Sequence, residues 1–193
     1  MKVILASASP RRREILQQLG IEFEVLPAQV DESSDEKDGA ALVRQLSLRK
    51  AHATREMLKQ QNALYQDTII IGCDTVVCCD GQILGKPRDR DDAAQMLSML
   101  SGKQHTVISG LTVLCGEHEV TDHEVTRVCF DPLSPADIAA YIATGEPHDK
   151  AGAYAIQGKA GRFIRGIEGD YFNVVGLPVH LLFDVTRRMG IDL

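Results

Sequence analysis

The stretch TIIIGCDTVVCCDGQIL, residues 68–84, is rich in β-branched residues on both sides of Asp74. It predicts two β-rich runs around that carboxylate. Asp80 and Gly81 are the residue types of a tight turn, so a hairpin is expected there. We therefore place Asp74 at the end of a buried strand, where open α/β sheets bind their ligands. A turn aspartate that only caps the backbone is the alternative.

Helices and further strands are predicted on both sides of this stretch. Strands are expected at 1–9, 105–115 and 124–130, the last two paired antiparallel around Gly116. Helices are expected from Pro10 to just before Gly20, from Leu42 to about residue 61, from Asp91 to Leu100, after the capping box that Ser134 opens until Gly145 closes the helix, and from Pro178 onward. Together these elements imply one α/β or α+β domain over residues 1–193, built on a mixed sheet whose strand order stays open.

Composition argues against several classes of protein. The chain has 193 residues, 44% of them hydrophobic and 25% charged, which is typical of a folded domain rather than a disordered or membrane protein. Its formal net charge of −6 argues against an extended face for duplex nucleic acid, so any anion site must be local. The first apolar run is too short for a signal peptide, and the five cysteines lack C-x-x-C spacing. We therefore expect a cytoplasmic protein with reduced thiols and no structural zinc site.

The segment SASPRRRE, residues 7–14, places three arginines in the first turn of a predicted helix. Ser9 is the expected N-cap and Pro10 the first helical residue. The positive end of the helix dipole disfavours each arginine there by roughly 0.3–1 kcal/mol. An anionic ligand would offset that cost, because guanidinium groups and free helix amides bind phosphate oxygens. The segment thus predicts a phosphate site at Ser7, Ser9 and residues 11–13, and a solvated basic face is the alternative.

Two later segments carry further polar groups suited to a ligand. Lys86 in GKPRD precedes Pro87, and this rigid frame favours a phosphate contact. The preceding glycine spacing is one residue short of a P-loop and Pro87 replaces Ser or Thr, so a P-loop is rejected. The glycine-rich segment, residues 144–161, lets a ligand approach the backbone, and Gln157 has the donor and acceptor needed to read a base edge. An ordinary hairpin is the alternative there; the other polar side chains of this segment are Glu146, Asp149 and Lys150.

Six segments together resemble the Maf family of nucleoside triphosphate pyrophosphatases. They are LASASPRRREIL, GCDTVV, GKPRD, SGKQHTVISG, DKAGAYAIQG and GDYFNVVGLP, and the resemblance runs nearly from end to end. It implies hydrolysis of a nucleoside triphosphate between the α and β phosphates, giving a monophosphate and pyrophosphate, with a divalent cation such as Mg²⁺ or Mn²⁺. It also implies a mixed elongated sheet with flanking helices, two lobes around a cleft as in inosine triphosphate pyrophosphatases, and a homodimer.

The resemblance also assigns candidate active-site residues. The matching positions are Ser7, Ser9, Glu32, Lys50, Asp74 and Lys86. On this interpretation the catalytic Asp74 accepts a proton from the attacking water, or binds the cation beside Glu32. Arg13, Lys50 and Lys86 neutralise the departing pyrophosphate. The sequence does not decide between the two roles of Asp74.

Three positions are thought to set base choice in the family, and this chain has Arg12, Thr75 and Gln157 there. The set resembles the branch acting on dTTP and UTP rather than the branch for 7-methylated GTP. We therefore expect dTTP and UTP, or modified pyrimidine nucleotides, as substrates. The alternative is a nucleotide-binding regulatory protein that acts on cell division or septum formation. An intact Asp74 favours catalysis, because a sensor has no use for a water-activating carboxylate.

Overall fold

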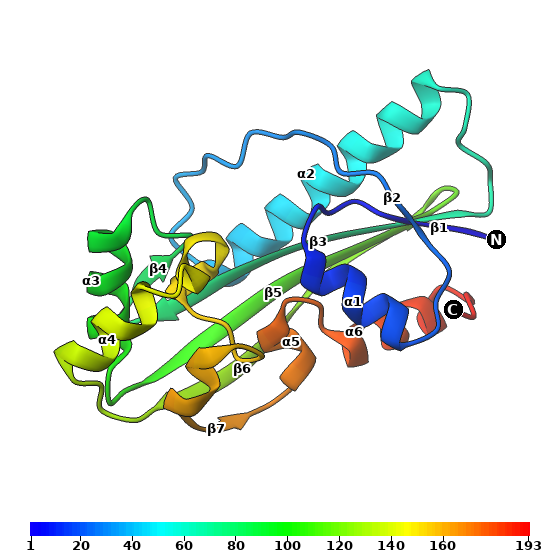
Figure 1. The fold of residues 1–193 in the computed structure, drawn as a ribbon. Helices are drawn as coiled ribbons and strands as arrows, with labels where there is room; N and C mark the ends of the chain where they lie inside the picture. The colour runs from blue at the N-terminus through cyan, green and yellow to red at the C-terminus, as the bar shows by residue number, and fades with distance from the viewer.

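A mixed sheet of seven strands runs through the computed structural model, which describes residues 1–193 (Figure 1). The strand order is β2 (Glu24–Val25), β1 (Lys2–Leu5), β3 (Thr68–Cys79), β5 (Gln104–Cys115), β6 (His118–Phe130) and β7 (Ile164–Glu168), with β4 (Gln82–Leu84) beside β3. β1 pairs parallel with β2 and β3, whereas every other pair is antiparallel, including the predicted pair β5 and β6. The predicted fold class, a mixed elongated sheet with flanking helices, is confirmed.

Helices cover both faces of the sheet (Figure 1). The long helix α2 (Gly39–Gln60) packs on one face. On the other face lie two groups of helices: α1 (Pro10–Gln18), α5 (Tyr171–Val175) and α6 (Val179–Arg188) toward one end, and α3 (Arg90–Leu100) and α4 (Pro135–Ile142) toward the other. A buried apolar cluster of 14 residues lies under the first group and one of 17 residues under the second. These two groups form the two lobes.

Local sequence signals fix several helix boundaries. α1 begins at Pro10, and Gly20 takes a φ of +73° just beyond its end. α4 has the predicted capping box, because the Asp137 N–H donates to the Ser134 hydroxyl at 3.1 Å and the Ser134 N–H donates to the Asp137 carboxylate at 3.2 Å. Ser9 is the N-cap of α1, as predicted. Its hydroxyl makes no capping bond, so the first-turn amides of α1 have no side-chain cap.

β3 is one continuous strand, so the prediction of two runs with Asp74 at a strand end is wrong. Asp74 lies in the middle of the strand and pairs with Gly110 of β5. On the other edge, β1 pairs with β3 only as far as Ile71, and β4 pairs with it only from Val77 onward. Residues 72–76 therefore have no strand on that edge. Asp74 lies where the neighbouring strands end, although its own strand continues.

Two glycines allow α2 to lie unusually close to the sheet. A Cβ at Gly72 would be 2.3 Å from the Ser47 carbonyl oxygen, and one at Gly110 would be 2.2 Å from that of Val43. Since no side chain fits at such distances, both positions require glycine. The close approach brings Lys50, one turn after Ser47, over the middle of β3.

Replacing Gly110 by alanine is therefore expected to push α2 away from the sheet and destabilise the fold by about 1–3 kcal/mol, as overpacking of a filled interior does. Urea denaturation monitored by circular dichroism would measure the loss of stability. Gly166→Ala is the matched control, because it is a strand glycine with nothing within 4 Å of the added Cβ. Equal stabilities of the two variants would contradict this account of the packing.

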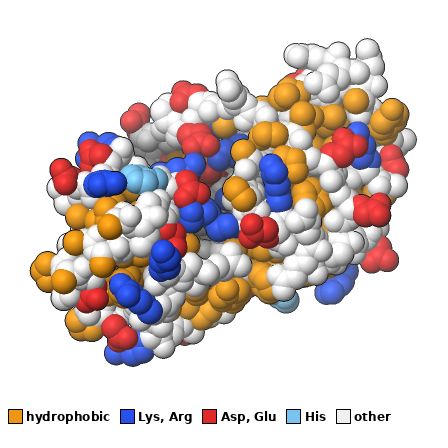
Figure 2. All heavy atoms as spheres, in the orientation of Figure 1, with side chains coloured by type: hydrophobic (Ala, Val, Ile, Leu, Met, Phe, Trp, Pro, Cys, Tyr) orange, Lys and Arg blue, Asp and Glu red, His pale blue; other side chains and the backbone are white.

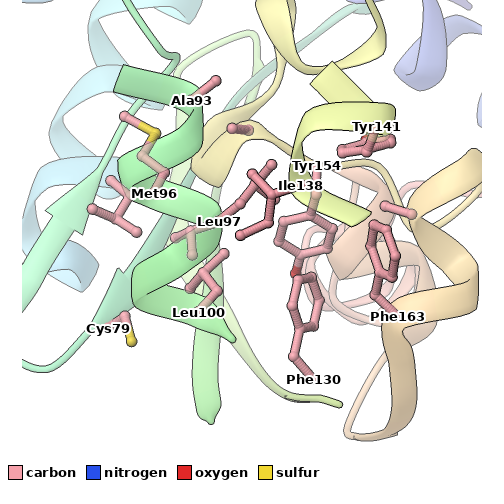
Figure 3. Close-up of a cluster of buried hydrophobic side chains, with 14 of the residues drawn as sticks. Cys79, Ala93, Met96, Leu97, Leu100, Phe130, Ile138, Tyr141, Tyr154 and Phe163 are labelled. Atoms are coloured by element: carbon pink, nitrogen blue, oxygen red, sulfur yellow. The ribbon is translucent and has the colours of Figure 1, made fainter. Parts of the chain in front are cut away.

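Four aromatic side chains pack within the larger cluster, at the α3 and α4 end of the molecule (Figure 3). The Phe130 and Tyr154 rings lie edge to face with centroids 4.9 Å apart, and the His105 ring contacts both. Burial lowers the pKa of His105 to about 4, so its ring is neutral, and its Nε2 lies 2.8 Å from the Tyr154 hydroxyl. Tyr141 and Phe163 pack edge to face at 5.6 Å. These contacts anchor the glycine-rich segment, which contains Tyr154, to the lobe.

Candidate active site

A cavity of about 630 Å³ opens beside the uncovered edge of β3. Its walls come from the β1–α1 loop, the loop before α2, α2 itself, the middle of β3 and the glycine-rich segment. Figure 2 shows a hollow around which acidic and basic side chains gather. The volume falls within the range of about 300–1,000 Å³ that is usual for small-molecule sites. The uncovered edge is thus the place where distant parts of the chain meet.

Lys50 joins two carboxylates in this cavity. Its Nζ lies 2.5 Å from Asp74 Oδ1 and 2.7 Å from Glu32 Oε1. The side chains of Lys50 and Asp74 are only 13% and 12% exposed, whereas that of Glu32 is 56% exposed. Because an isolated buried charge is costly, the lysine and Asp74 compensate each other. Asp74 is thereby fixed at the cavity wall from the α2 side.

The surrounding cations keep Glu32 ionised. Its partial burial alone would raise its pKa, but the hydrogen bond and charge of Lys50, with the charges of Lys86 and Arg12, lower the pKa below its ordinary value. Glu32 comes from the acidic loop, residues 31–38, which contains no helix or strand. Its carboxylate therefore remains an oxygen ligand or hydrogen-bond acceptor at neutral pH.

Arg12 is buried at another wall of the cavity and ties three segments together. Its Nε donates to the Gly176 carbonyl at 2.7 Å, its Nη1 to Ser7 Oγ at 2.8 Å and its Nη2 to Thr75 Oγ1 at 3.1 Å. The Thr75 hydroxyl also lies 2.8 Å from Ser109 Oγ. The guanidinium group thus fixes the β1–α1 loop against β3 and the segment between α5 and α6.

The glycine-rich segment and the hairpin after β3 supply further lining residues. Lys86 and Gln157 are exposed, line the cavity and have no hydrogen-bond or ion-pair partner within the chain. Asp149 forms ion pairs with Lys150 and, at 3.4 Å, with Arg11. The segment folds into short 3₁₀ turns rather than two paired strands, so the hairpin alternative is wrong. Two unpaired polar side chains therefore remain available to a ligand.

The cavity is cationic although the protein is acidic. Its lining includes five basic side chains against three carboxylates, in a chain with a formal net charge of −6. The basic residues are Arg11, Arg12, Lys50, Lys86 and Lys150, and the carboxylates are Glu32, Asp74 and Asp149. This local excess of positive charge attracts an anionic ligand.

The structure brings ten of the eleven predicted site residues to this one cavity. They are Ser7, Ser9, Arg11, Arg12, Glu32, Lys50, Asp74, Thr75, Lys86 and Gln157. Arg13 is different: it is exposed and does not line the cavity, so the geometry gives no support to its predicted phosphate contact. Lys50 is predicted to neutralise pyrophosphate, but its ammonium group already forms ion pairs with two carboxylates of the protein.

Three contributors are not among the predicted site residues. Asp149 and Lys150 are polar groups of the glycine-rich segment, and their adjacent opposite charges are the available signal. Gly176 contributes through its carbonyl oxygen, which accepts from the Arg12 Nε–H. No side-chain signal could reveal a main-chain acceptor of this kind.

Asp74 and Glu32 are the side chains suited to a divalent cation. No group of three or more His, Cys, Asp or Glu side chains that could hold a metal ion occurs in the structure. Mg²⁺ is often held by one or two protein carboxylates, with substrate phosphates and water completing its coordination. The donor set fits that pattern: Asp74 and Glu32 would hold the cation, although Lys50 contacts both carboxylates in this structure.

Comparison with known proteins finds relatives that share one name and match this chain over nearly its whole length. Relatives named "dTTP/UTP pyrophosphatase" include one from Alkaliphilus oremlandii, 50% identical over 190 residues that cover 97% of this chain and 95% of the relative. Another, from Thermoanaerobacter sp. (strain X514), is 47% identical and covers 97% and 96%. A third, from Agathobacter rectalis, is 45% identical over 205 residues and covers 100% and 99%.

A solved structure, that of the Staphylococcus aureus Ham1 protein, aligns with 67% of this chain and 72% of its own. The TM-score is 0.47 and the sequence identity 8%. None of the helices is both long and apolar enough to cross a membrane. The family model described as Maf-like protein matches residues 2–189, and with the relatives above it shows that the chain belongs to the Maf family.

Proposed function

We propose that the protein hydrolyses dTTP and UTP to the monophosphate and pyrophosphate. The observation that carries this proposal is the Asp74 carboxylate, held by Lys50 at the wall of a cation-rich cavity. Relatives that are 45–50% identical over nearly the whole chain are named for this activity. A modified pyrimidine nucleotide would fit the same site.

The triphosphate would bind where the basic side chains converge. Lys86 has no partner within the chain and is free to contact phosphate oxygens. Lys150 and Arg11 lie on the same cavity and are paired only through Asp149. The first-turn amides of α1, which Ser9 leaves uncapped, add donors at the positive end of a helix dipole.

Asp74 would act on the attacking water. Hydrolysis of the α–β anhydride adds water oxygen to the α-phosphorus, and the bridging oxygen leaves with pyrophosphate. The water's proton passes to Asp74 if the carboxylate acts as a general base. Lys50 keeps the carboxylate in one position by its 2.5 Å contact, so the water can be held in line with the breaking bond.

A divalent cation, Mg²⁺ or Mn²⁺, is part of the proposal. Asp74 and Glu32 would hold it together with phosphate oxygens, and it would supply neutralising charge and a more acidic bound water. The lowered pKa of Glu32 keeps that carboxylate ionised for such a role.

The pyrimidine base would lie toward Gln157, whose amide is free to donate and accept. Arg12 and Thr75 are hydrogen-bonded to each other, so they would shape this region rather than offer all their polar atoms to the base.

A cytoplasmic location and a homodimer are further parts of the proposal. The five free cysteines are compatible with a reducing compartment.

A panel of ordinary and modified nucleoside triphosphates tests the proposed activity. We expect pyrophosphate and a nucleoside monophosphate in equal amounts, with dTTP and UTP converted fastest, and we expect EDTA to stop turnover. Ion chromatography of the products would measure this. Release of orthophosphate would indicate a phosphatase, and nucleotide binding without any turnover would favour the regulatory alternative.

A further inference from the structure

The turn that carries Gln157 is held by side chains that lie outside the cavity. The Gly158 N–H donates to the Ala155 carbonyl at 3.0 Å, which closes a tight turn with Gln157 near its tip. Gln157 lines the cavity and is exposed, so its own side chain does not fix its position. The position of its amide therefore depends on what holds the two ends of the turn.

Tyr141 and Glu146 hold both ends. The Tyr141 hydroxyl donates to Glu146 Oε1 at 2.8 Å and accepts from the Ala155 N–H at 3.3 Å. The other carboxylate oxygen, Glu146 Oε2, accepts from the Lys159 N–H at 3.1 Å. We call these two residues the Tyr141–Glu146 bracket. It binds the main chain immediately before and after the turn.

The Tyr141–Glu146 bracket belongs to the lobe that contains α3 and α4, since Tyr141 is a buried member of its apolar cluster. Tyr141 is 1% exposed and packs edge to face on Phe163, as Figure 3 shows. A Cβ at Gly158 would lie 2.1 Å from Glu146 Oε1, so the carboxylate can approach the turn only because residue 158 is glycine. Burial and the Glu146 carboxylate raise the pKa of Tyr141, so the phenol keeps its proton and remains a donor. Neither residue lines the cavity.

We propose that Tyr141 and Glu146 are positioning residues that set the base discrimination of the enzyme by fixing the turn that carries Gln157. This inference rests on the proposed function. A uracil edge presents an acceptor at O4 and a donor at N3, whereas a cytosine edge presents a donor at N4 and an acceptor at N3. A glutamine amide matches either edge when it can both rotate and shift relative to the base. A fixed main-chain turn removes the shift and so limits the positions that the amide can take against a base.

The test compares kcat/KM for UTP and CTP in four variants: Glu146→Ala, Tyr141→Phe, Gln157→Ala and the Glu146→Ala/Gln157→Ala double variant. We expect Glu146→Ala and Tyr141→Phe to reduce the UTP-to-CTP ratio by about tenfold, since a displacement of about 1 Å costs up to about 100-fold. The loss should appear mainly in KM for UTP, with kcat within about twofold. The double variant should have the same UTP-to-CTP ratio of kcat/KM as Gln157→Ala alone, because the bracket acts only through Gln157.

Matched controls separate positioning from stability. Glu168→Ala removes an exposed carboxylate on β7 that is paired with Arg127 at 3.1 Å, and it should leave the ratio unchanged. Glu146→Gln retains a carbonyl acceptor and should recover part of the ratio lost in Glu146→Ala. If Glu146→Ala fails to fold, Tyr141→Phe and Glu146→Gln still test the bracket.

The outcomes distinguish the inference from the function on which it rests. If wild type discriminates, Gln157→Ala loses discrimination and the bracket variants keep it, the inference is wrong while the proposed function stands. Equal losses of kcat for both nucleotides in the bracket variants would also overturn it. If wild type releases no pyrophosphate from UTP, or Gln157→Ala discriminates as well as wild type, the proposed role of Gln157 fails and the inference fails with it.

Discussion

Replacing Asp74 by asparagine is expected to lower kcat for pyrophosphate release by about 10²–10⁴-fold, the range that a general acid or base contributes. Asparagine has nearly the same shape as aspartate, but it lacks the charge and basicity to accept a proton or to hold a cation. Because the substitution keeps the volume of a side chain that is 12% exposed, the overall fold should persist. A continuous pyrophosphate assay at saturating UTP measures the loss.

Asp80→Asn is the control for this experiment. Asp80 is an exposed aspartate whose carboxylate pairs with Lys103 at 2.6 Å, away from the cavity lining. We expect wild-type turnover from this variant, and thermal unfolding curves should show that both variants are folded. Turnover of Asp74→Asn within a few-fold of wild type would refute the role assigned to Asp74.

The second large effect is expected from Lys50→Met. Methionine is close to lysine in length but removes the ammonium group that contacts both Asp74 and Glu32. Two carboxylates then face the cavity without their shared cation, and substrate phosphates would meet more negative charge. We expect kcat/KM for UTP to fall by about 10²–10³-fold, comparable with the loss of a preorganised charged contact.

The pH dependence gives this variant a separate signature. Lys50 is among the groups that lower the pKa of Glu32, while burial raises it, so removing the lysine raises that pKa. If the ionised form of Glu32 is the active one, the acidic limb of the kcat/KM profile moves to higher pH in Lys50→Met. An acidic limb that stays in place would show that Glu32 ionisation does not govern activity.

Local features of the chain were predicted well. Pro10 at the start of α1, the Ser134 and Asp137 capping box and the turn at Asp80 and Gly81 depend on residues close together in the sequence. Their chemistry acts within a few residues, so no knowledge of tertiary structure is needed. Ser9 is likewise the N-cap of α1, although its hydroxyl caps no amide and its N–H donates to Ser7 Oγ at 3.3 Å.

The difference between Arg12 and Arg13 follows from helix phase. Arg12 lies three and four residues before Ile15 and Leu16, both buried, so it shares their face of α1. Arg13 is on the exposed side of that helix. This periodicity was visible in the sequence, and it could have separated the arginine that reaches the cavity from the one that does not.

The meeting of Asp74, Lys50 and Glu32 could not be predicted from local pattern. Glu32 lies in an irregular loop and Lys50 in a helix, and only the glycine-dependent packing of α2 on β3 brings Lys50 to Asp74. The sequence pointed to these residues through resemblance to a family. The position of Asp74 in mid-strand likewise depends on where β1 and β4 stop, which is decided by distant segments.

The uncovered edge of β3 has a consequence for how such enzymes can diversify. Side chains alternate along a strand, so Asp74 points to the α2 layer and meets Lys50, while Thr75 points to the opposite layer and meets Arg12. Because no strand covers that edge, one hollow is open to both layers. If Asp74 activates the water and Gln157 reads the base, as proposed, the two tasks draw on opposite layers of the sheet, and a lineage could acquire a new substrate by altering one layer while conserving the other.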